Sequence, residues 1–357
     1  MSLHFEKIKI KEVKKETSHC VSIAFDIPPT LVGRFAFKAG QYLTLRALIN
    51  GAEVRRSYSL CSSPLEDEWR VAVKKVEGGM FSTYANEMLK AGDTLELMPP
   101  MGNFHTEINP LNSKHYIGIA AGSGITPVIS IIKTVLQAEP NSRFTLVYGN
   151  RNRHSIIFKD ALEAIKNKYL SRFNIIHILS REITDATINH GRINAEKCAH
   201  LFEKALQINA DGFFICGPEE MTLEVKHFLE KNGVDEKKIH IELFTTGNNH
   251  PGPERETIHA NEATKSSITV TLDGVSFNFE LAYDDASILD AAAQQGADVP
   301  YSCKSGVCCT CRAKLLEGEV EMEVCYGLEP EEIAGGYILT CQSHPKSNRV
   351  VIDYDAK

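Results

Sequence analysis

The distribution of apolar residues divides the chain into parts with different periods. Up to about residue 108, short stretches place an apolar residue at every second position, which is typical of antiparallel strands with one buried face. The spacing of these stretches and the turn residues between them predict an antiparallel β-barrel. The predicted strands are 3–13, 19–25, 42–48, 53–60, 69–76 and 94–98, and one helix is predicted at 82–89.

Between residues 109 and 244, apolar strands alternate with amphipathic helices. Elements of this size in this order predict an α/β domain with a doubly wound parallel sheet, whose ligands bind at the carboxyl ends of the strands. The first predicted strand ends just before Gly122, and the others cover 144–148, 174–179, 212–215 and 239–242. The predicted helices are 129–137, 158–168, 194–206 and 219–232. The Gly-rich turn at 122–126 suits a phosphate, although a tight strand–helix turn has the same composition.

The end of the chain follows a polar segment without periodicity. Residues 245–265 contain Gly and Pro and no regular apolar pattern, so a linker is expected there. Two alternating stretches at 267–272 and 275–281, joined by Asp273-Gly274, then predict a β-hairpin. A helix at 287–295 and strands at 337–341 and 349–353 would complete a small sheet of the β-grasp type.

Four cysteines in this last part have the spacing of a plant-type [2Fe–2S] site. Cys303, Cys308 and Cys311 are separated by four and two residues, and Cys341 lies 30 positions beyond Cys311. A structural zinc site is the alternative, but such sites usually contain two close cysteine pairs, and only Cys308 and Cys311 fit. If Cys309 were a ligand, the gaps would match no such site, so it is expected to be a packed loop thiol.

Composition narrows the class of protein further. The chain is 43% hydrophobic and 24% charged, as in ordinary soluble proteins, and no apolar run is long enough to span a membrane. The N-terminal residues do not form a signal-peptide core. Four of the ten cysteines belong to the cluster motif and the others are scattered, which favours a reducing cytoplasm over a disulfide-bonded secreted protein.

Negative charge is concentrated beside the cysteine motif. Residues 266–357 contain 6 Lys and Arg against 15 Asp and Glu, a net charge of −9, whereas the rest of the chain has 33 against 31, a net charge of +2. This distribution argues against a nucleic-acid partner. A positively charged protein partner and simple solubility both remain as explanations.

Two further motifs lie in the barrel. Along the strand at 53–60, Arg56 and Tyr58 share one face and Ser57 and Ser59 share the other. An Arg and a Tyr on one face could bind a phosphate and pack on a ring, but a surface strand with a core tyrosine would look the same. The residues 79–82 approach a helix N-terminus, where free N–H groups favour a phosphate.

In this order, the motifs resemble the ferredoxin–NADP reductase superfamily with a fused C-terminal plant-type ferredoxin. Residues 56–59 look like its flavin motif and 79–82 like its FAD pyrophosphate motif, while 122–127 and 216–221 are similar to its two nicotinamide-nucleotide motifs. The most similar members are reductase components of multicomponent oxygenases, of the phenylacetyl-CoA epoxidase and steroid 9α-hydroxylase types.

This resemblance implies a division into domains and an electron path. It implies an FAD-binding barrel at 1–108, an NAD(P)-binding domain at 109–244, a linker at 245–265 and a [2Fe–2S] ferredoxin domain at 266–357. Electrons would pass from NAD(P)H through FAD and the cluster to an oxygenase, above all a phenylacetyl-CoA epoxidase. FMN in place of FAD stays open, although residues 79–82 favour FAD. A redox sensor without turnover is the alternative from another class of protein.

The resemblance also assigns roles to individual residues. Ser59, Cys216 and Glu242 would lie where hydride passes from the nicotinamide to the flavin, and Phe244 would cover the flavin. The residues implied in flavin binding are Arg56, Ser57, Tyr58, Ser59, Gly79, Met80, Phe81 and Ser82, and those implied in nucleotide binding are Gly122, Ser123, Gly124, Thr126, Ser180, Arg181, Cys216, Gly217, Pro218 and Met221.

The choice between NADPH and NADH depends on the residues after the third strand of the nucleotide domain. Ser180 and Arg181 suit the 2′-phosphate of NADPH, whereas the acidic Glu182 suits the ribose diol of NADH. NADPH is the favoured expectation, and Arg181 as a solvated surface residue is the alternative.

Overall fold

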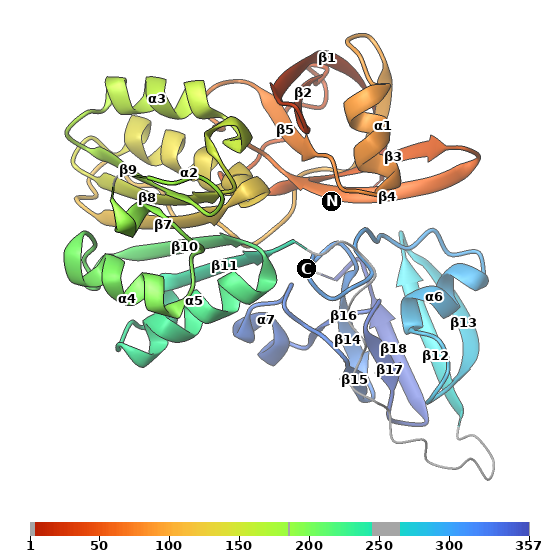
Figure 1. Ribbon diagram of the computed structural model, residues 1–357. Coiled ribbons are helices and arrows are strands. Elements are labelled where there is room, and N and C mark those ends of the chain that lie inside the picture. The colour runs from red at the N-terminus through yellow and green to blue at the C-terminus, as the bar shows by residue number, and fades with distance from the viewer. Residues whose placement is uncertain (1–3, 185, 245–264, 357) are drawn as a thin grey trace.

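The computed structural model describes residues 4–184, 186–244 and 265–356, which form three domains around three sheets (Figure 1). The barrel and the nucleotide domain lie side by side, and the C-terminal domain packs below the barrel next to β11 (Figure 1). This arrangement confirms the predicted fold class. The predicted linker at 245–265 lies, except for its last residue, outside the described residues.

The first domain is a six-stranded antiparallel sheet with the order β4-β3-β6-β1-β2-β5. A bridge between Leu60 and Val71 joins its two edges and closes the barrel. Apolar side chains from alternate positions, with Ile8, Leu45 and Val71 fully buried, fill its interior. Its elements are β1 (Glu6–Thr17), β2 (Cys20–Asp26), β3 (Tyr42–Ile49), β4 (Ala52–Ser59), β5 (Trp69–Lys74), α1 (Met80–Glu87) and β6 (Thr94–Leu97).

The second domain is a five-stranded parallel sheet with the order β11-β10-β7-β8-β9. Helices α2 and α3 cover one face and α4 and α5 the other, so the strands are buried on both sides (Figure 1). The strand order reverses between β7 and β10, where ligands bind in folds of this kind. Its elements are β7 (His115–Ala121), α2 (Ile125–Ala138), β8 (Arg143–Asn150), α3 (Lys159–Lys168), β9 (Phe173–Leu179), α4 (Ala195–Lys204), β10 (Gly212–Gly217), α5 (Glu219–Lys231) and β11 (Ile239–Leu243).

The third domain is a five-stranded mixed sheet with the order β13-β12-β18-β14-β16, accompanied by the pair β15-β17. Strand β18 runs parallel to β12, and α6 packs its apolar face, including Ile288 and Leu289, on the sheet. Its elements are β12 (Lys265–Leu272), β13 (Val275–Ala282), α6 (Ile288–Gln294), β14 (Arg312–Glu317), β15 (Val320–Met322), α7 (Pro330–Ala334), β16 (Tyr337–Leu339), β17 (Ser343–Pro345) and β18 (Arg349–Asp353).

Several elements begin or end away from their predicted bounds. Strand β1 runs on to Thr17, and its pairing with β2 is irregular between Ile10 and Glu12 and again between Lys15 and Thr17. Helix α2 begins at Ile125, four residues before the prediction, and Pro127 occupies its first turn. The sequence analysis missed the short elements β14, β15, α7 and β17. Among the described residues, no helix has the length and apolar character needed to cross a membrane.

Candidate flavin, nucleotide and cluster site

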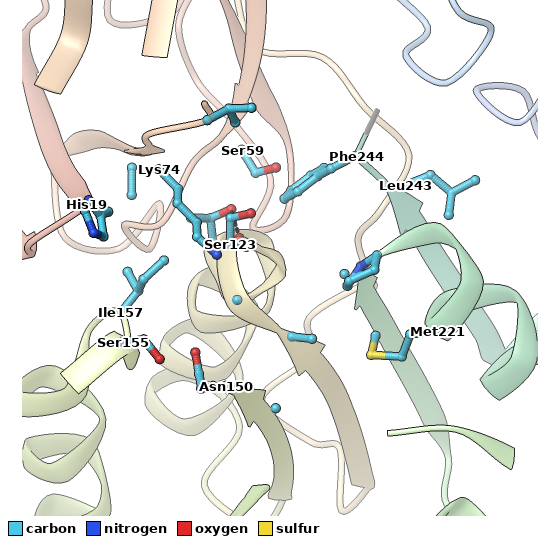
Figure 2. A pocket seen from close by; sticks show the side chains of 18 of the residues that line it. His19, Ser59, Lys74, Ser123, Asn150, Ser155, Ile157, Met221, Leu243 and Phe244 are labelled. Carbon is cyan, nitrogen blue, oxygen red and sulfur yellow. Dashed lines mark hydrogen bonds between the residues drawn. The ribbon is translucent and has the colours of Figure 1, made fainter. Parts of the chain in front are cut away.

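A cavity of about 1140 Å³ lies where the three domains meet. Residues at the carboxyl ends of β7 and β8, residues of the barrel and residues around Cys303 and Cys308 line it. Figure 2 shows the part between the barrel and the nucleotide domain. Its volume exceeds that of a usual small-ligand pocket, as the binding of two dinucleotides requires. The predicted site residues that line it are Arg56, Ser57, Tyr58, Ser59, Gly79, Met80, Phe81, Ser82, Gly122, Ser123, Thr126, Ser180, Arg181, Gly217, Pro218, Met221, Glu242, Phe244, Cys303 and Cys308.

The barrel contributes a ring-binding wall and an anion-binding turn to this cavity. The Tyr58 ring packs on Phe81, with 5.5 Å between centroids, so the side chain is held against the cavity wall. Helix α1 begins at Met80, and no side chain caps its first N–H groups. Ser82 instead accepts the Val76 N–H and donates to the Gly79 carbonyl, which shapes the turn. The uncapped helix start therefore fits a pyrophosphate.

Space also explains the glycine before α1. A Cβ on Gly79 would lie 2.5 Å from Ser82 Oγ and 3.1 Å from the Val76 carbonyl oxygen. A side chain at this position would displace the Ser82 hydroxyl from the turn and crowd Val76. The glycine thus keeps the backbone close enough for a phosphate to reach the N–H groups.

A partly buried carboxyl group, that of Glu242, lies where β4 and β11 approach each other. Ser59 Oγ donates to Glu242 at 3.3 Å and 3.4 Å from its two carboxylate oxygens. Burial raises the pKa of Glu242 to about 8, and the hydrogen bond from Ser59 opposes this shift. Figure 2 shows Ser59, Phe244 and Ser123 around the same space. The site thus holds a carboxyl group that can be neutral at neutral pH next to a hydroxyl group.

The Gly-rich turn after β7 lies against the end of β10. A Cβ on Gly124 would come within 2.0 Å of the Cys216 carbonyl oxygen, so this position has room only for hydrogen. The turn continues into α2, and Thr126 Oγ1 donates to the Ser123 carbonyl. The close approach leaves Gly122, Ser123 and Thr126 on the cavity side, where backbone and hydroxyl groups could bind phosphate.

Basic side chains gather on the nucleotide side of the cavity. Lys74, at the end of β5, extends toward the turn at Ser123, and its Nζ is 3.1 Å from the position of a Cβ on Gly122 (Figure 2). Burial and the positive charge of Arg151 lower the pKa of Lys74, because both make the charged ammonium group less favourable. Arg181 and Arg192 line the cavity farther along. The sequence analysis missed Lys74 and Arg192; for Lys74, its place at the end of a strand was the available signal.

The acidic residue that favoured NADH faces away from this basic group. Glu182 forms an ion pair with Arg153 and accepts the Arg153 backbone N–H at 2.9 Å. This hydrogen bond, ahead of the side-chain interactions with Arg153, lowers the pKa of Glu182. Glu182 does not line the cavity, whereas Ser180 and Arg181 do.

The four cysteines of the motif are close together in the ferredoxin domain. Cys303 Sγ accepts the N–H groups of Ser305 at 3.3 Å and Cys308 at 3.4 Å. The side-chain hydrogen bond with Cys308, reinforced by these backbone donors, lowers the pKa of Cys303. In the same way, Cys311 is within hydrogen-bonding reach of Cys341.

Paired thiols with backbone donors fit a two-iron cluster, whose sulfur ligands attach two by two to its irons. In the described part of the chain, no group of three or more His, Cys, Asp or Glu side chains is arranged to hold a single metal ion.

Some predicted residues do not reach the cavity. Cys216 is fully buried between β7 and β11, and Gly124 is covered by it. Burial, and then Glu242, raise the pKa of the Cys216 thiol well above its ordinary range. Cys311 and Cys341 lie in the core of the ferredoxin domain. Cys309 is buried as expected, but at an interface with the barrel rather than within its own loop.

Comparisons with known proteins agree with this arrangement. Three family models match in the order of the domains: the oxidoreductase FAD-binding domain at residues 7–106, the oxidoreductase NAD-binding domain at 119–227 and the 2Fe-2S iron-sulfur cluster binding domain at 270–346.

Two relatives are similar over their whole length. One of the subunits of 1,2-phenylacetyl-CoA epoxidase from Escherichia coli is 44% identical over 99% of this chain and 98% of that protein. The ferredoxin reductase component of 3-ketosteroid-9-alpha-monooxygenase from Rhodococcus rhodochrous is 34% identical over 97% and 96%.

A solved structure has the same architecture. Phthalate dioxygenase reductase, described as a modular structure for electron transfer from pyridine nucleotides to [2Fe–2S], superimposes with a TM-score of 0.60 at 26% identity and covers 98% of both chains. The chain therefore belongs to the family of ferredoxin–NADP reductase-like reductase components of multicomponent oxygenases, in which electrons pass through FAD and a [2Fe–2S] cluster.

Proposed function

We propose that this reductase takes electrons preferentially from NADPH and delivers them to an oxygenase of the phenylacetyl-CoA epoxidase type. The observation that carries the electron path is the single cavity lined by flavin-motif residues, nucleotide-motif residues and two cluster cysteines. When bound, FAD accepts hydride from the nicotinamide, and the cluster accepts electrons singly. The protein's part is to bring the three groups together and to exclude water.

The residues of the barrel divide the work of holding the flavin. Arg56 would neutralise its diphosphate together with the start of α1, and Tyr58 would pack on its ring system, supported by Phe81. Ser59 and Glu242 would orient the groups at the hydride-transfer position through their hydrogen bond. Phe244 would cover the flavin until the nicotinamide displaces it.

The preference for NADPH rests on charge. Ser180, Arg181 and Arg192 line the same end of the cavity, and Glu182 is engaged by Arg153 instead of being available to a ribose diol. A 2′-phosphate would form charge-assisted hydrogen bonds with the guanidinium groups, which the NADH diol cannot do equally well. Lys74 and Arg151 would bind the phosphates nearer the nicotinamide.

An anaerobic titration of the purified protein with NADPH and with NADH tests this preference. The flavin absorbance should bleach, followed by the [2Fe–2S] bands, at much lower NADPH than NADH concentration. Replacing Arg181→Ala should raise the KM for NADPH by about tenfold or more and leave that for NADH nearly unchanged, since one charged hydrogen bond is lost. The exposed Arg143→Ala, outside the cavity, serves as control. Equal use of both nucleotides by the unaltered protein would contradict the proposal.

The acceptor is proposed from the relatives. The 44% identity to the epoxidase subunit over nearly the whole chain favours an epoxidase acceptor over a steroid monooxygenase, whose reductase is 34% identical. Reconstitution with each oxygenase component, measured as NADPH consumption coupled to product formation, would decide between them. We also propose a cytoplasmic location, where NADPH and the oxygenase acceptor would both be available. Steady reduction of cytochrome c would exclude a sensor without turnover.

A further inference from the structure

A polar seam joins the ferredoxin domain to the barrel beside the cavity. Tyr42 and Thr44 of β3 pair with Ser59 and Ser57 of β4, so these four side chains lie on one face of the two strands. Residues 302–311, which we call the cluster-binding loop, cover this face. Ser57 Oγ donates to Ser302 Oγ at 2.8 Å, and the hydroxyl groups of Thr44 and Thr310 are 3.4 Å apart.

Tyr42 is the centre of the seam. Its hydroxyl oxygen accepts the backbone N–H of Cys309 at 3.1 Å and lies 3.2 Å from Cys309 Sγ and 3.1 Å from Thr310 Oγ1. Tyr42 and Cys309 are 5% and 6% exposed, so the contact is shielded from water. Two of these contacts join Tyr42 to the backbone N–H and to the side chain of Cys309. Together they fix both the orientation of the loop and its distance from β3.

A second, charged contact lies on β4, two residues before Ser57 and on the same face of the strand. Arg55, which is only 6% exposed, donates to Asp298 at 3.0 Å, and its guanidinium carbon lies 4.1 Å from the centre of the Tyr301 ring. Tyr301 and Ser302 lead directly into Cys303. The loop is therefore held on the barrel on both sides of its first cluster ligands.

The seam has a consequence for the side of the cluster that faces the flavin. Cys303 and Cys308 line the cavity, whereas Cys311 and Cys341 belong to the core of the ferredoxin domain. Cys308 is next to Cys309 in the chain, so the contact of Cys309 with Tyr42 fixes the position of Cys308 most directly.

We propose that Tyr42 and Cys309 are the positioning pair for electron transfer within the molecule: they seat the Cys303–Cys308 side of the cluster against the flavin cavity. One of the two electrons that hydride transfer brings to the flavin then passes to the cluster through this side. Neither residue binds a cofactor; both act by placing Cys308. The inference rests on the path through FAD and the cluster and is independent of the nucleotide and the acceptor.

Anaerobic stopped-flow mixing of the whole protein with excess NADPH separates the relevant steps. In Tyr42→Phe and Cys309→Ala, the bleaching of the flavin should keep its rate, and the reduction of the cluster should be slowed roughly fivefold to tenfold, as expected for the loss of one to three buried hydrogen bonds. Cys309→Ser keeps a hydrogen-bonding side chain and should restore most of the rate.

Hydrogen–deuterium exchange and redox potentials test positioning directly. Residues 303–312 should exchange faster in Tyr42→Phe and Cys309→Ala, with iron content and the midpoint potentials of both cofactors unchanged. The controls Tyr116→Phe and Cys198→Ala remove a buried hydroxyl and a buried thiol from the nucleotide domain and should alter neither the cluster phase nor the exchange of this loop.

Unchanged rates of cluster reduction in Tyr42→Phe and Cys309→Ala would overturn the inference. If these variants lose the cluster, Thr310→Val gives the same test, because it removes a hydroxyl group that contacts the Tyr42 hydroxyl, and an unchanged cluster phase in it would also overturn the inference. Failure of the NADPH preference would appear in the flavin phase alone and is therefore distinguishable.

Discussion

At the scale of single residues, the least expected feature is a carboxyl group with a raised pKa in the wall of the cavity. Glu242 lies near the end of β11 next to Cys216 on β10; Cys216 is fully buried, whereas Glu242 is partly buried in the cavity wall. No cation pairs with Glu242 in the hydrogen bonds and ion pairs of the described residues; its partner is the Ser59 hydroxyl. The neutral acid is therefore the form that the fold favours.

The raised pKa of Glu242 should make the free energy of unfolding depend on pH. Its pKa is about 8 in the folded protein, against the ordinary value of 4.5, so the folded state retains a proton that the unfolded state has lost. The stabilisation that comes from the bound proton is complete below pH 4.5. It decreases between pH 4.5 and pH 8 and is lost above pH 8. Glu242→Gln should therefore gain stability over the native chain between pH 6 and pH 9, by about 2 kcal/mol.

Thermal melts of the two proteins at both pH values measure this gain. The exposed Glu203→Gln on α4 is the control and should show no such change with pH. A constant difference in melting temperature between Glu242→Gln and the native chain would mean that Glu242 is ionised throughout.

At the scale of elements, the turn between β7 and α2 sets the geometry of the nucleotide site. Its backbone touches the end of β10, the strand at which the order of the sheet reverses. Three backbone atoms of Cys216 and Gly217 lie within 2.8 Å of the position of a Cβ on Gly124, and none belongs to a flexible side chain. Relief would require the end of β10 to move, together with the start of α5.

Gly124→Ala should therefore damage both stability and nucleotide binding. We expect a loss of about 3 kcal/mol, at the upper end for overpacking, and at least tenfold weaker binding of NADPH. Gly33→Ala is a matched control, because a Cβ at Gly33 meets nothing within 4 Å, and its effect should stay within about 0.5 kcal/mol. Thermal melting and titration with NADP⁺, which avoids turnover, give both quantities. A variant as stable as the native chain would show that the end of β10 can move freely.

The sequence could predict features that depend on neighbouring residues, but not those that depend on contacts between distant parts of the chain. Alternation along β4 correctly separated Ser57 and Ser59 from Tyr58, because a period of two is a property of the strand alone. It could not reveal that Arg55, on the face of Ser57, is buried by Asp298 and Tyr301, since the covering domain comes more than 240 residues later. The same limit applies to Tyr42, which no motif marked, and to Cys309, whose partner lies 267 residues away.

Short elements were missed for a different reason. Strands β15 and β17 have three residues each and α7 has five, too few for a periodic pattern to stand out. The cysteine spacing was informative without any such pattern, because four thiolates around two irons restrict the sequence directly. The roles of individual site residues remain predictions that the variants described here would test.

At the scale of the whole molecule, the order of domains along the chain differs from their order along the electron path. The nucleotide domain is second in the chain, but the electron path would begin there, and all three domains contribute walls to one cavity. Contacts link the ferredoxin domain mainly to the barrel, as in the seam and in the hydrogen bond from Asn103 to Glu332. The arrangement is thus a relay in which the flavin site is central.

A relay of this kind predicts that removing the cluster separates two activities. Cys308→Ser removes one predicted cluster ligand, which lines the cavity, and leaves the predicted flavin and nucleotide residues in place. Reduction of ferricyanide, which a reduced flavin can perform directly, should persist at the native rate. Reduction of cytochrome c should fall by more than tenfold if the cluster carries the electrons. Cys325→Ser, a cysteine of the same domain outside the ligand spacing, should keep both activities.

The two assays also distinguish a relay from a ferredoxin domain that serves only for docking. If Cys308→Ser kept both activities while its iron content fell, electrons would leave from the flavin, and the seam at Tyr42 would be an attachment rather than a route. If both activities were lost with FAD still bound, the cluster loop would be needed to shape the flavin cavity, which Cys303 and Cys308 help to line. Only the loss of cytochrome c reduction alone places the cluster after the flavin on the path.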